Sequence, residues 1–249
     1  MKEWKTRSVA SLEEVGKNLA NSLRRGLPIL DVGPPLPQSV AVVGGGPSIA
    51  LEVEALKSWQ GFIVAINGAH DWLLDHGITP DGMIVLDPQA CMVRYLDRAN
   101  EHTTYLVASC CAPEVFDRLK GKRVVLWHAM QGEQVPDAPG YFIWGGPTAM
   151  SRAPHLMHMF GFRDIHLFGA DSSVGSSGTH AYSHPLSRLE AQIPVRCGEQ
   201  IFITDTGMAM QAEWLYRAVQ EAPADTKITI RGAGLASAIV RENGEFQLL

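Results

Sequence analysis

The chain has 249 residues, of which 46% are hydrophobic, and it carries 21 Lys and Arg against 26 Asp and Glu, a formal net charge of −5. This composition excludes disorder as the main state, because enough apolar surface can be buried to offset the entropy of ordering. The slight acidity argues against a nucleic-acid partner, which needs a clustered basic footprint. The N-terminus lacks an apolar signal core, and no uncharged apolar stretch reaches roughly 18 residues, so we expect no membrane partner and a cytoplasmic protein.

The N-terminal part of the sequence differs in character from the rest. A helical pattern over residues 12–25 is followed by a proline-rich stretch at 31–37, which we interpret as a linker. We therefore divide the chain into residues 1–38, a helical segment with its linker, and residues 39–249, a single domain.

From residue 39 onward, short apolar runs alternate with helical patterns. The predicted strands are 40–43, 62–66, 83–86, 105–108, 124–127, 165–168 and 228–230. The predicted helices are 49–59, 69–76, 93–100, 114–120, 148–160 and 208–221. The strands are continuously apolar, as in strands covered on both faces, which predicts an α/β fold with a mostly parallel sheet and helices on both sides.

Two stretches depart from this regular alternation. Pro154 interrupts the helical pattern at 148–160, so that helix either begins near Ser151 or kinks at the proline. Residues 171–200 have little periodicity, and we interpret them as a long loop of the kind that often serves as a lid.

The sharpest local motif is Gly44-Gly45-Gly46-Pro47-Ser48, at the end of the first core strand. Its glycines allow a ligand to approach the backbone closely, and the helix that follows offers unpaired amides to an anion. This pattern predicts a phosphate site, although it lacks the lysine of a P-loop and the third glycine of a dinucleotide fingerprint. The alternative is a tight strand-to-helix turn with no ligand.

Polar residues also end the next two strands. Asn67-Gly68 follows one of them and Asp87-Pro88 follows the other. Ligands of open parallel sheets bind outside the carboxyl ends of the strands, so Asn67 is a candidate for reading a base or ribose and Asp87 for binding ribose hydroxyls or a cation. Each pair is also an ordinary turn former.

A second glycine turn, Gly145-Gly146-Pro147-Thr148, precedes the helix at 148–160 and predicts a second anion subsite with Thr148 as cap or donor. The strand at 165–168 then delivers Asp171 to its carboxyl end. In the loop that follows, His180 and His184 are candidates for a general base or a phosphate donor. A metal pair of these histidines is less favoured, because i,i+4 spacing has little meaning outside a helix.

The order of the motifs is more specific than any one of them. They are Gly44-Gly45-Gly46-Pro47-Ser48, Ala65-Ile66-Asn67-Gly68-Ala69, Leu86-Asp87-Pro88, Gly145-Gly146-Pro147-Thr148-Ala149, Gly169-Ala170-Asp171-Ser172-Ser173 and Thr179-His180-Ala181-Tyr182. From about residue 39 to 235 the chain resembles the 6-hydroxymethylpterin diphosphokinase MptE-like family, and the resemblance ends in Gln211 of the late helix and Gly232-Ala233-Gly234-Leu235. The same frame is similar to the sialyltransferases of glycosyltransferase family 42 and to flagellin-modifying proteins related to them.

These resemblances imply a Rossmann-like sheet that binds a nucleotide, which is ATP in the pterin kinase and a CMP-sugar in the sialyltransferases. Carried over to this chain, they place the nucleotide against Gly44–Ser48, Asn67, Gly68 and Asp87. Gly146 and Thr148 would flank the reacting phosphate. Asp171 and the loop with His180 and His184 would line the reaction centre. Pro147, where we would expect a small polar residue, departs from the family pattern.

Three hypotheses follow. The first is diphosphate transfer from ATP to a hydroxymethyl-bearing small molecule such as a pterin, with Mg²⁺ held by Asp87 or Asp171 and deprotonation by His180 or His184. The second is a metal-independent glycosyltransferase that uses a CMP-sugar or a similar donor. The third is a non-catalytic nucleotide-binding module. The expected partners are a nucleotide and a small-molecule acceptor, and the oligomeric state, a homo-oligomer included, stays open.

Overall fold

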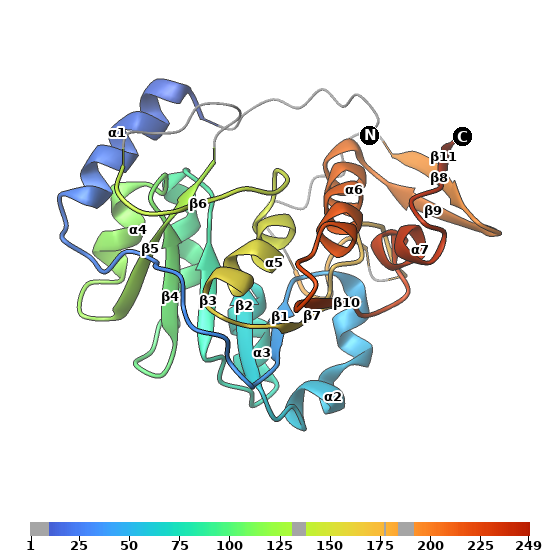
Figure 1. Ribbon diagram of the computed structural model, residues 1–249, viewed down its shortest axis with the longest axis horizontal. Helices are drawn as coiled ribbons and strands as arrows, with labels where there is room; N and C mark the ends of the chain where they lie inside the picture. Colours follow the sequence, from blue (N-terminus) through green and yellow to red (C-terminus); the bar gives the residue numbers. More distant parts are fainter. Residues whose placement is uncertain (1–9, 131–137, 177, 184–191) are drawn as a thin grey trace.

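The computed structural model describes residues 10–130, 138–176, 178–183 and 192–249. Within them, eight parallel strands form one sheet in the order β10-β7-β1-β2-β3-β4-β5-β6 (Figure 1). The strands are β1 (Val40–Val43), β2 (Phe62–Ile66), β3 (Gly82–Val85), β4 (Thr104–Ala108), β5 (Arg123–Ala129), β6 (Phe142–Ile143), β7 (Asp164–Phe168) and β10 (Lys227–Ile230). The chain folds as an α/β protein of the Rossmann-like type, as predicted.

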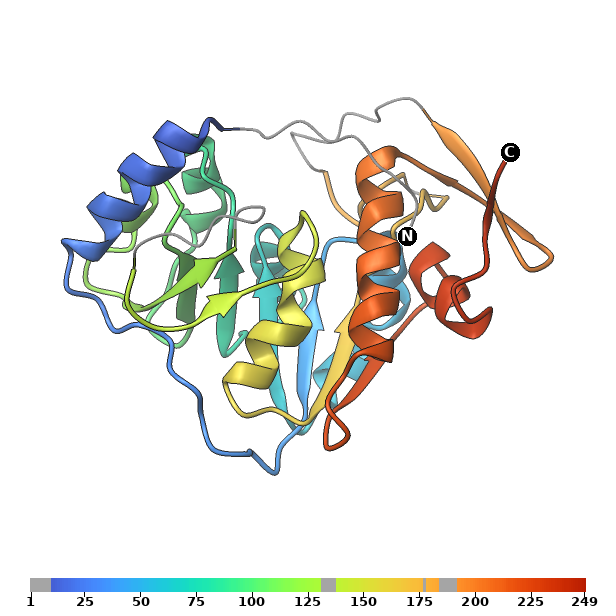
Figure 2. The same cartoon turned by 45° about the horizontal axis from the view of Figure 1, so that its top comes forward.

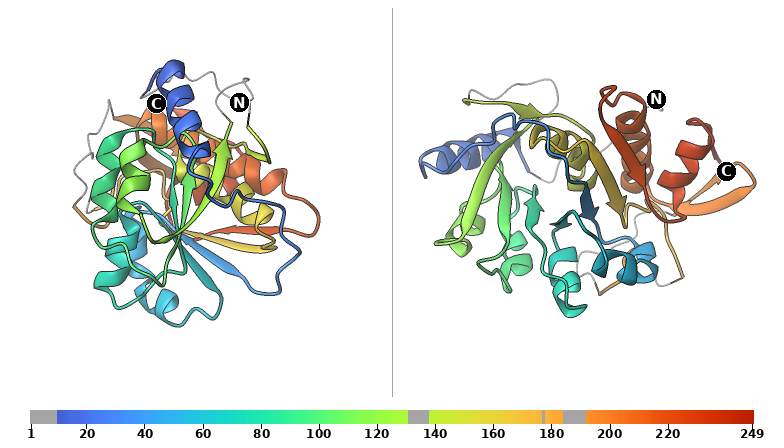
Figure 3. Two further views of the ribbon diagram at one scale, coloured as in Figure 1. Left: turned by 90° about the vertical axis from the view of Figure 1, so that its left-hand side faces the viewer. Right: turned by 60° about the horizontal axis from the view of Figure 1, so that its bottom comes forward.

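Helices cover both faces of this sheet. Figure 3 shows α3 (Ala69–Asp75) and α4 (Pro113–Arg118) on one side, and α5 (Ala149–Met159) and α6 (Thr206–Gln220) on the other. The remaining helices are α1 (Leu12–Leu23), α2 (Val53–Lys57), α7 (Leu235–Arg241) and the 3-10 helices η1 (Pro47–Leu51) and η2 (Ala90–Leu96). The predicted helix at 49–59 is therefore divided between η1 and α2, and the one at 93–100 is the 3-10 helix η2.

The strands in the middle of the sheet are mostly apolar because both of their faces are buried. Every residue of β1 and β3 is buried. Successive residues of β1 belong to different cores: Val40 and Val42 pack in the larger core cluster, and Ala41 and Val43 in the smaller one with Leu73. Because alternate side chains of β1 pack into the two cores, the strand and its carboxyl end are held from both faces of the sheet.

A small antiparallel sheet extends beyond α6 and α7 (Figure 2). It consists of β8 (Ile193–Cys197), β9 (Gln200–Thr204) and β11 (Gln247–Leu248), in the order β11-β8-β9. The prediction of a continuous loop over 171–200 is therefore wrong from residue 193 onward. The strands escaped detection because their residues are mostly half-buried or exposed and the apolar pattern is weak.

Helix α5 begins at Ala149 and contains Pro154. Thr148 is the N-cap, its side chain accepts from the Ser151 amide, and the two residues form a capping box. The helix runs over Ala149–Met159, in agreement with the predicted range 148–160, and Pro154 lies inside it rather than in its first turn. The capping box stabilises the first turn at the carboxyl edge of the sheet.

Helix α1 packs against α4 and covers the carboxyl ends of β3 and β4. Asn18 Nδ2 donates to the carbonyl of Cys110 at 2.9 Å and to that of Pro88 at 3.3 Å. Ser22 Oγ donates to the carbonyl of Ser109 at 3.0 Å. In the described part of the chain, no helix is long and apolar enough to cross a membrane.

Candidate functional site

The order in which strands are added to the sheet reverses beside β1. From β1 it builds the sheet outward through β2 to β6, and it then returns to place β7 on the other side of β1. Loops leave such a switch point in opposite directions and open a crevice at the carboxyl ends. A cavity of about 230 Å³ lies here. Its lining residues are Gly44, Gly45, Gly46, Ile66, Asn67, Thr148, Ala149, Met150, Gly169, Ser172, Ser173, Thr179, His180, Tyr182, Met208 and Gln211.

The first glycine turn is held tightly by its neighbours. The Gly44 amide donates to the Phe168 carbonyl at 2.8 Å, and the Gly46 amide donates to the Gly169 carbonyl at 2.9 Å. A Cβ on Gly46 would lie 2.6 Å from the same Gly169 oxygen. The expectation of unpaired amides in the helix that follows is wrong at its first two N–H groups, because the Ser48 amide donates to Asp171 Oδ2 at 3.1 Å and the Ile49 amide to the Gly46 carbonyl at 3.2 Å. The turn brings its backbone to the cavity wall without forming a complete amide cradle.

Asp171 fixes the end of this turn. Its Oδ2 accepts from the Ser48 amide at 3.1 Å and from Ser48 Oγ at 2.9 Å. The side chain is 5% exposed. Burial raises the pKa of the carboxyl group, and the two bonds from Ser48 oppose that shift. Asp171 and Ser48, like Pro47, are not among the lining residues. The structure thus gives Asp171 contacts that join β7 to the glycine turn.

Asn67 is held in a conformation that non-glycine residues rarely adopt. Its φ is +47°, and the other left-handed non-glycine residue at the cavity is Ser172, at +55°. Such strain persists where the surrounding structure enforces it, and it concentrates at functional sites. The Asn67 side-chain oxygen is also buried without a hydrogen-bond partner among the described residues. This oxygen is the clearest unsatisfied acceptor at the cavity wall.

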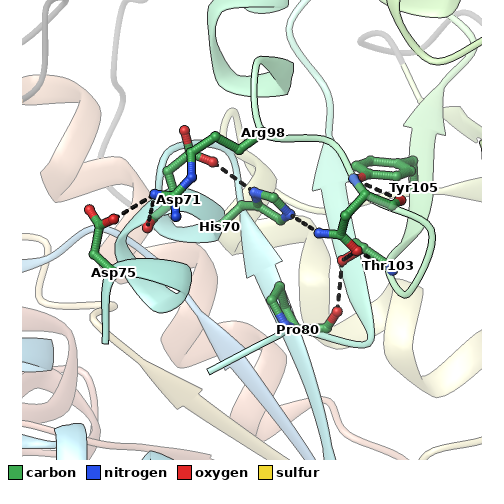
Figure 4. A network of polar contacts seen from close by, with 8 residues as sticks. His70, Asp71, Asp75, Pro80, Arg98, Thr103 and Tyr105 are labelled. Atoms are coloured by element: carbon green, nitrogen blue, oxygen red, sulfur yellow. Dashed lines mark hydrogen bonds and ion pairs between the residues drawn. The ribbon is translucent and has the colours of Figure 1, made fainter. Parts of the chain in front are cut away.

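A buried polar network supports the position of Asn67. The Asn67 carbonyl accepts from the His70 amide at 3.0 Å. His70 Nδ1 lies 2.8 Å from Asp71 Oδ1, and its Nε2 faces Asn100, whose Oδ1 accepts from Thr103 (Figure 4). These contacts tie the first turn of α3 to the segment before β4, so the strand-to-helix turn cannot relax by moving α3.

Asp87 lies away from the cavity lining. Its Oδ1 accepts from the Gln89 amide at 3.0 Å, and burial raises the pKa of its carboxyl group. Among the described residues, no group of three or more His, Cys, Asp and Glu could hold a metal ion, and the described lining contains no carboxylate. Mg²⁺ prefers carboxylate and phosphate oxygens. Neither Asp87 nor Asp171, the two alternative magnesium ligands predicted from the sequence, lies in the described lining, so the described cavity wall offers the cation no protein carboxylate.

The second glycine turn contributes to the opposite wall. Thr148 lines the cavity, and its Oγ1 lies 2.7 Å from Oε1 of Gln211 on α6. Gln211 Nε2 in turn lies 2.9 Å from Ser172 Oγ. Gly146 packs against the Trp214 ring, where a Cβ would come within 2.5 Å, and it is not a lining residue.

His180 and Tyr182 cover the first glycine turn. Between them, the Ala181 amide donates to the Gly45 carbonyl at 3.0 Å. A Cβ on Gly45 would lie 2.6 Å from both His180 Cδ2 and the Tyr182 hydroxyl, and one on Gly68 would lie 2.9 Å from the Tyr182 ring. Burial raises the pKa of Tyr182 well above its ordinary value, so the phenol keeps its proton at neutral pH. His184 lies outside the described residues.

The structure thus brings together the predicted residues Gly44, Gly45, Gly46, Asn67, Thr148 and His180 at one cavity. It adds Ser172, Tyr182 and Gln211, to which the sequence alone gives no separate role. Ser172 and Tyr182 belong to the motifs that contain Asp171 and His180. Their closeness in sequence to these predicted site residues was therefore a signal that could have found them. Gln211, in the late helix, belongs to the stretch that resembles the family, but the sequence gives it no contact and no role.

A protein-family model matches most of the chain. Residues 13–176 match the model described as 6-hydroxymethylpterin diphosphokinase MptE-like. The chain belongs to this family. The matched segment of this MptE-like protein contains both glycine turns, Asn67 and Ser172. A comparison with curated proteins gives no match.

A solved structure has the same fold as this MptE-like protein. It is that of the MAf glycosyltransferase from Magnetospirillum magneticum AMB-1, and it matches with a TM-score of 0.66 and 19% sequence identity. The match covers 93% of this chain and 41% of the neighbour, so the chain spans less than half of that protein. The family indicates a transferase-like function, and the neighbour shows the fold.

Proposed function

We propose that this protein is a nucleotide-dependent transferase that binds its activated donor in the cavity at the carboxyl ends of β1, β2 and β7. The observation that carries the proposal is the buried Asn67 oxygen, which has no partner among the described residues and belongs to a strained residue at the cavity wall. An amide in this position supplies a specific polar contact to a base or ribose.

Glycosyl transfer from a nucleotide sugar is the reaction that the lining fits best. The described lining offers hydroxyl, amide, imidazole and phenol groups and no carboxylate, so it supplies hydrogen bonds without a protein-bound cation. The structural neighbour is a glycosyltransferase, which supports the same reaction class. We therefore place this reaction ahead of diphosphate transfer.

In this reaction, the acceptor hydroxyl forms a bond to the anomeric carbon of the sugar. The bond from that carbon to the phosphate oxygen breaks, and its electron pair leaves with the phosphate. His180 is our candidate for taking the acceptor proton, with His184 as the second candidate. The neutral Tyr182 phenol would donate a hydrogen bond to the departing phosphate, where negative charge develops.

Diphosphate transfer from ATP is the second candidate, because the family model is described by that activity. This reaction would need Mg²⁺, with the nucleotide phosphates as its main ligands. The pterin acceptor has no specific support among the described lining residues. Metal dependence separates the two candidates.

The test is a thermal-shift titration with ATP, GTP, CTP, CMP and a CMP-sugar, each with Mg²⁺ and with EDTA. A ligand at 100 times its dissociation constant stabilises the fold by roughly 2.7 kcal/mol. We expect stabilisation by a nucleotide sugar in EDTA, followed by sugar transfer in a direct assay that His180→Ala impairs. Stabilisation by ATP only with Mg²⁺ would favour the kinase. Binding without turnover of any donor would favour the non-catalytic module, and no binding would contradict the proposal.

A further inference from the structure

Three polar side chains connect opposite walls of the cavity. Gln211 of α6 lies between Thr148, the N-cap of α5, and Ser172, which follows β7. Thr148 Oγ1 is 2.7 Å from Gln211 Oε1, and Gln211 Nε2 is 2.9 Å from Ser172 Oγ. All three residues line the cavity. Because a glutamine amide has one accepting and one donating end, the two hydroxyls are not equivalent.

The Thr148 hydroxyl donates its hydrogen bond to another protein group. Its shortest contact, at 2.7 Å, is to the Gln211 carbonyl oxygen, which can only accept. A longer contact of 3.1 Å leads to Ser151 Oγ, and one lone pair of Thr148 accepts from the Ser151 amide at 3.1 Å. The second lone pair remains, so Thr148 presents an acceptor to the cavity.

The Ser172 hydroxyl has the opposite polarity. Its oxygen accepts from the Gln211 amide nitrogen, so its own proton points elsewhere. The protein acceptor for that proton is the Ala170 carbonyl at 3.4 Å, which is long for an O–H···O bond. Thr204 Oγ1 donates to the Ser172 carbonyl at 2.8 Å and holds the left-handed backbone in place. An anionic oxygen at ordinary distance would be a much stronger acceptor than Ala170.

We propose that Gln211 fixes the hydrogen-bond polarity of the cavity, so that Ser172 donates to an oxyanion of the bound donor and Thr148 accepts from a hydroxyl group of the sugar to be transferred. This inference rests on the proposed function and adds the chemical class of the ligand. A molecule with a phosphate oxygen next to a sugar hydroxyl satisfies both positions, and inorganic phosphate alone satisfies only the first. It also revises the sequence-based expectation that Thr148 donates to a phosphate.

The variants separate the two ends of this arrangement. Ser172→Ala removes the donor. Thr148→Val removes the acceptor, and Thr148→Ser restores it. Gln211→Glu replaces the amide by a carboxylate that accepts from both hydroxyls and adds a negative charge, so Ser172 loses its free proton. Gln220→Glu, in the last turn of the same helix, is the matched control for added charge, since Gln220 is not a lining residue.

The experiment is calorimetric titration of the full chain with inorganic pyrophosphate, CMP and CMP-N-acetylneuraminic acid. We expect Ser172→Ala and Gln211→Glu to weaken binding of all three probes by about tenfold, the loss of one charge-assisted hydrogen bond. Thr148→Val should leave pyrophosphate and CMP within about twofold of the wild type and weaken the nucleotide sugar by about fivefold, as expected for one neutral hydrogen bond. Thermal unfolding of each variant separates these effects from the loss of the α5 cap.

The inference would be overturned if Thr148→Val and Ser172→Ala weakened pyrophosphate binding equally. It would also be overturned if Gln211→Glu bound the three probes with wild-type affinity. A wild type that binds the probes normally while the variants change nothing overturns the inference and leaves the proposed function standing. A wild type that binds none of the probes, nor any nucleotide in the thermal-shift screen, overturns both.

Discussion

The two halves of the sheet's carboxyl edge differ in what occupies them. At β1, β2 and β7 the edge opens into a cavity lined by glycines, hydroxyls and two left-handed non-glycine residues, Asn67 and Ser172. At β3 and β4 the edge is covered by α1, whose Asn18 and Ser22 side chains bond the loop carbonyls. The crevice thus opens at the switch point between β1 and β7, whereas the N-terminal helix covers the edge at β3 and β4.

The comparison explains why Asp87 is not part of the cavity lining. It ends its strand in the same way as Asn67, so the sequence treats the two alike. In the fold, however, Asp87 belongs to the half that α1 covers. Both residues follow a strand at the same edge of the sheet. Which strand each one follows therefore decides whether it can contact a ligand in the cavity.

The largest expected effect comes from removing the carboxylate that supports the open half. Asp171→Ala leaves the Ser48 amide and hydroxyl without their acceptor, and two bonds to a charged group are worth about 3 kcal/mol together. We expect urea unfolding to show a loss of this size and nucleotide affinity to fall with it. Asp171→Asn keeps an acceptor oxygen and should recover part of both. A fully stable, fully binding alanine variant would contradict this role of Asp171.

The covered half should affect stability without affecting binding. Asn18→Ala removes the donor to the buried Cys110 carbonyl and to the partly buried Pro88 carbonyl, and it should cost about 2 kcal/mol in urea unfolding. Nucleotide affinity at a temperature where the variant is folded should equal that of the wild type. A parallel loss of affinity would show that the two halves of the edge form one site.

Asn67→Gly should have the opposite effects, with higher stability and weaker nucleotide binding. Glycine relieves the left-handed strain and stabilises the fold by about 1 kcal/mol, while loss of the side-chain oxygen weakens nucleotide binding by about tenfold. Asn243→Gly is the matched control, because Asn243 is also left-handed, at a φ of +48°, but is not a lining residue. Stability should rise in both variants and affinity should fall only in the first. Unchanged affinity in Asn67→Gly would remove the observation on which the proposed function rests.

The smallest expected effect is a pH dependence of stability in the covered half. Burial lowers the pKa of His128 below its ordinary value of 6.5. The unfolded chain therefore binds a proton at a higher pH than the folded chain, and the free energy of unfolding should fall as the pH drops below about 6.5. Replacement by glutamine should flatten this slope in urea titrations between pH 7.5 and 5.5. A slope that steepens in His128→Gln would show that the sign is wrong.

Much of the fold could be predicted because the core strands are buried on both faces and keep a strong apolar signal. The small sheet β8-β9-β11 could not, since half-exposed strands such as β9 lack that signal. At the site, the glycine turn and Asn67 were identifiable from strand ends. The role of Gln211 was not, because it depends on contacts with Thr148 and Ser172, which are 63 and 39 residues away in the chain.

The most direct test of the central claim is a crystal structure of the protein with the nucleotide that stabilises it most in the thermal-shift screen. The account predicts density in the cavity of β1, β2 and β7, with the base or ribose on the Asn67 side-chain oxygen and a phosphate oxygen within hydrogen-bond distance of Ser172 Oγ. A nucleotide bound at the carboxyl ends of β3 and β4, with its ribose or a cation on Asp87, would contradict it.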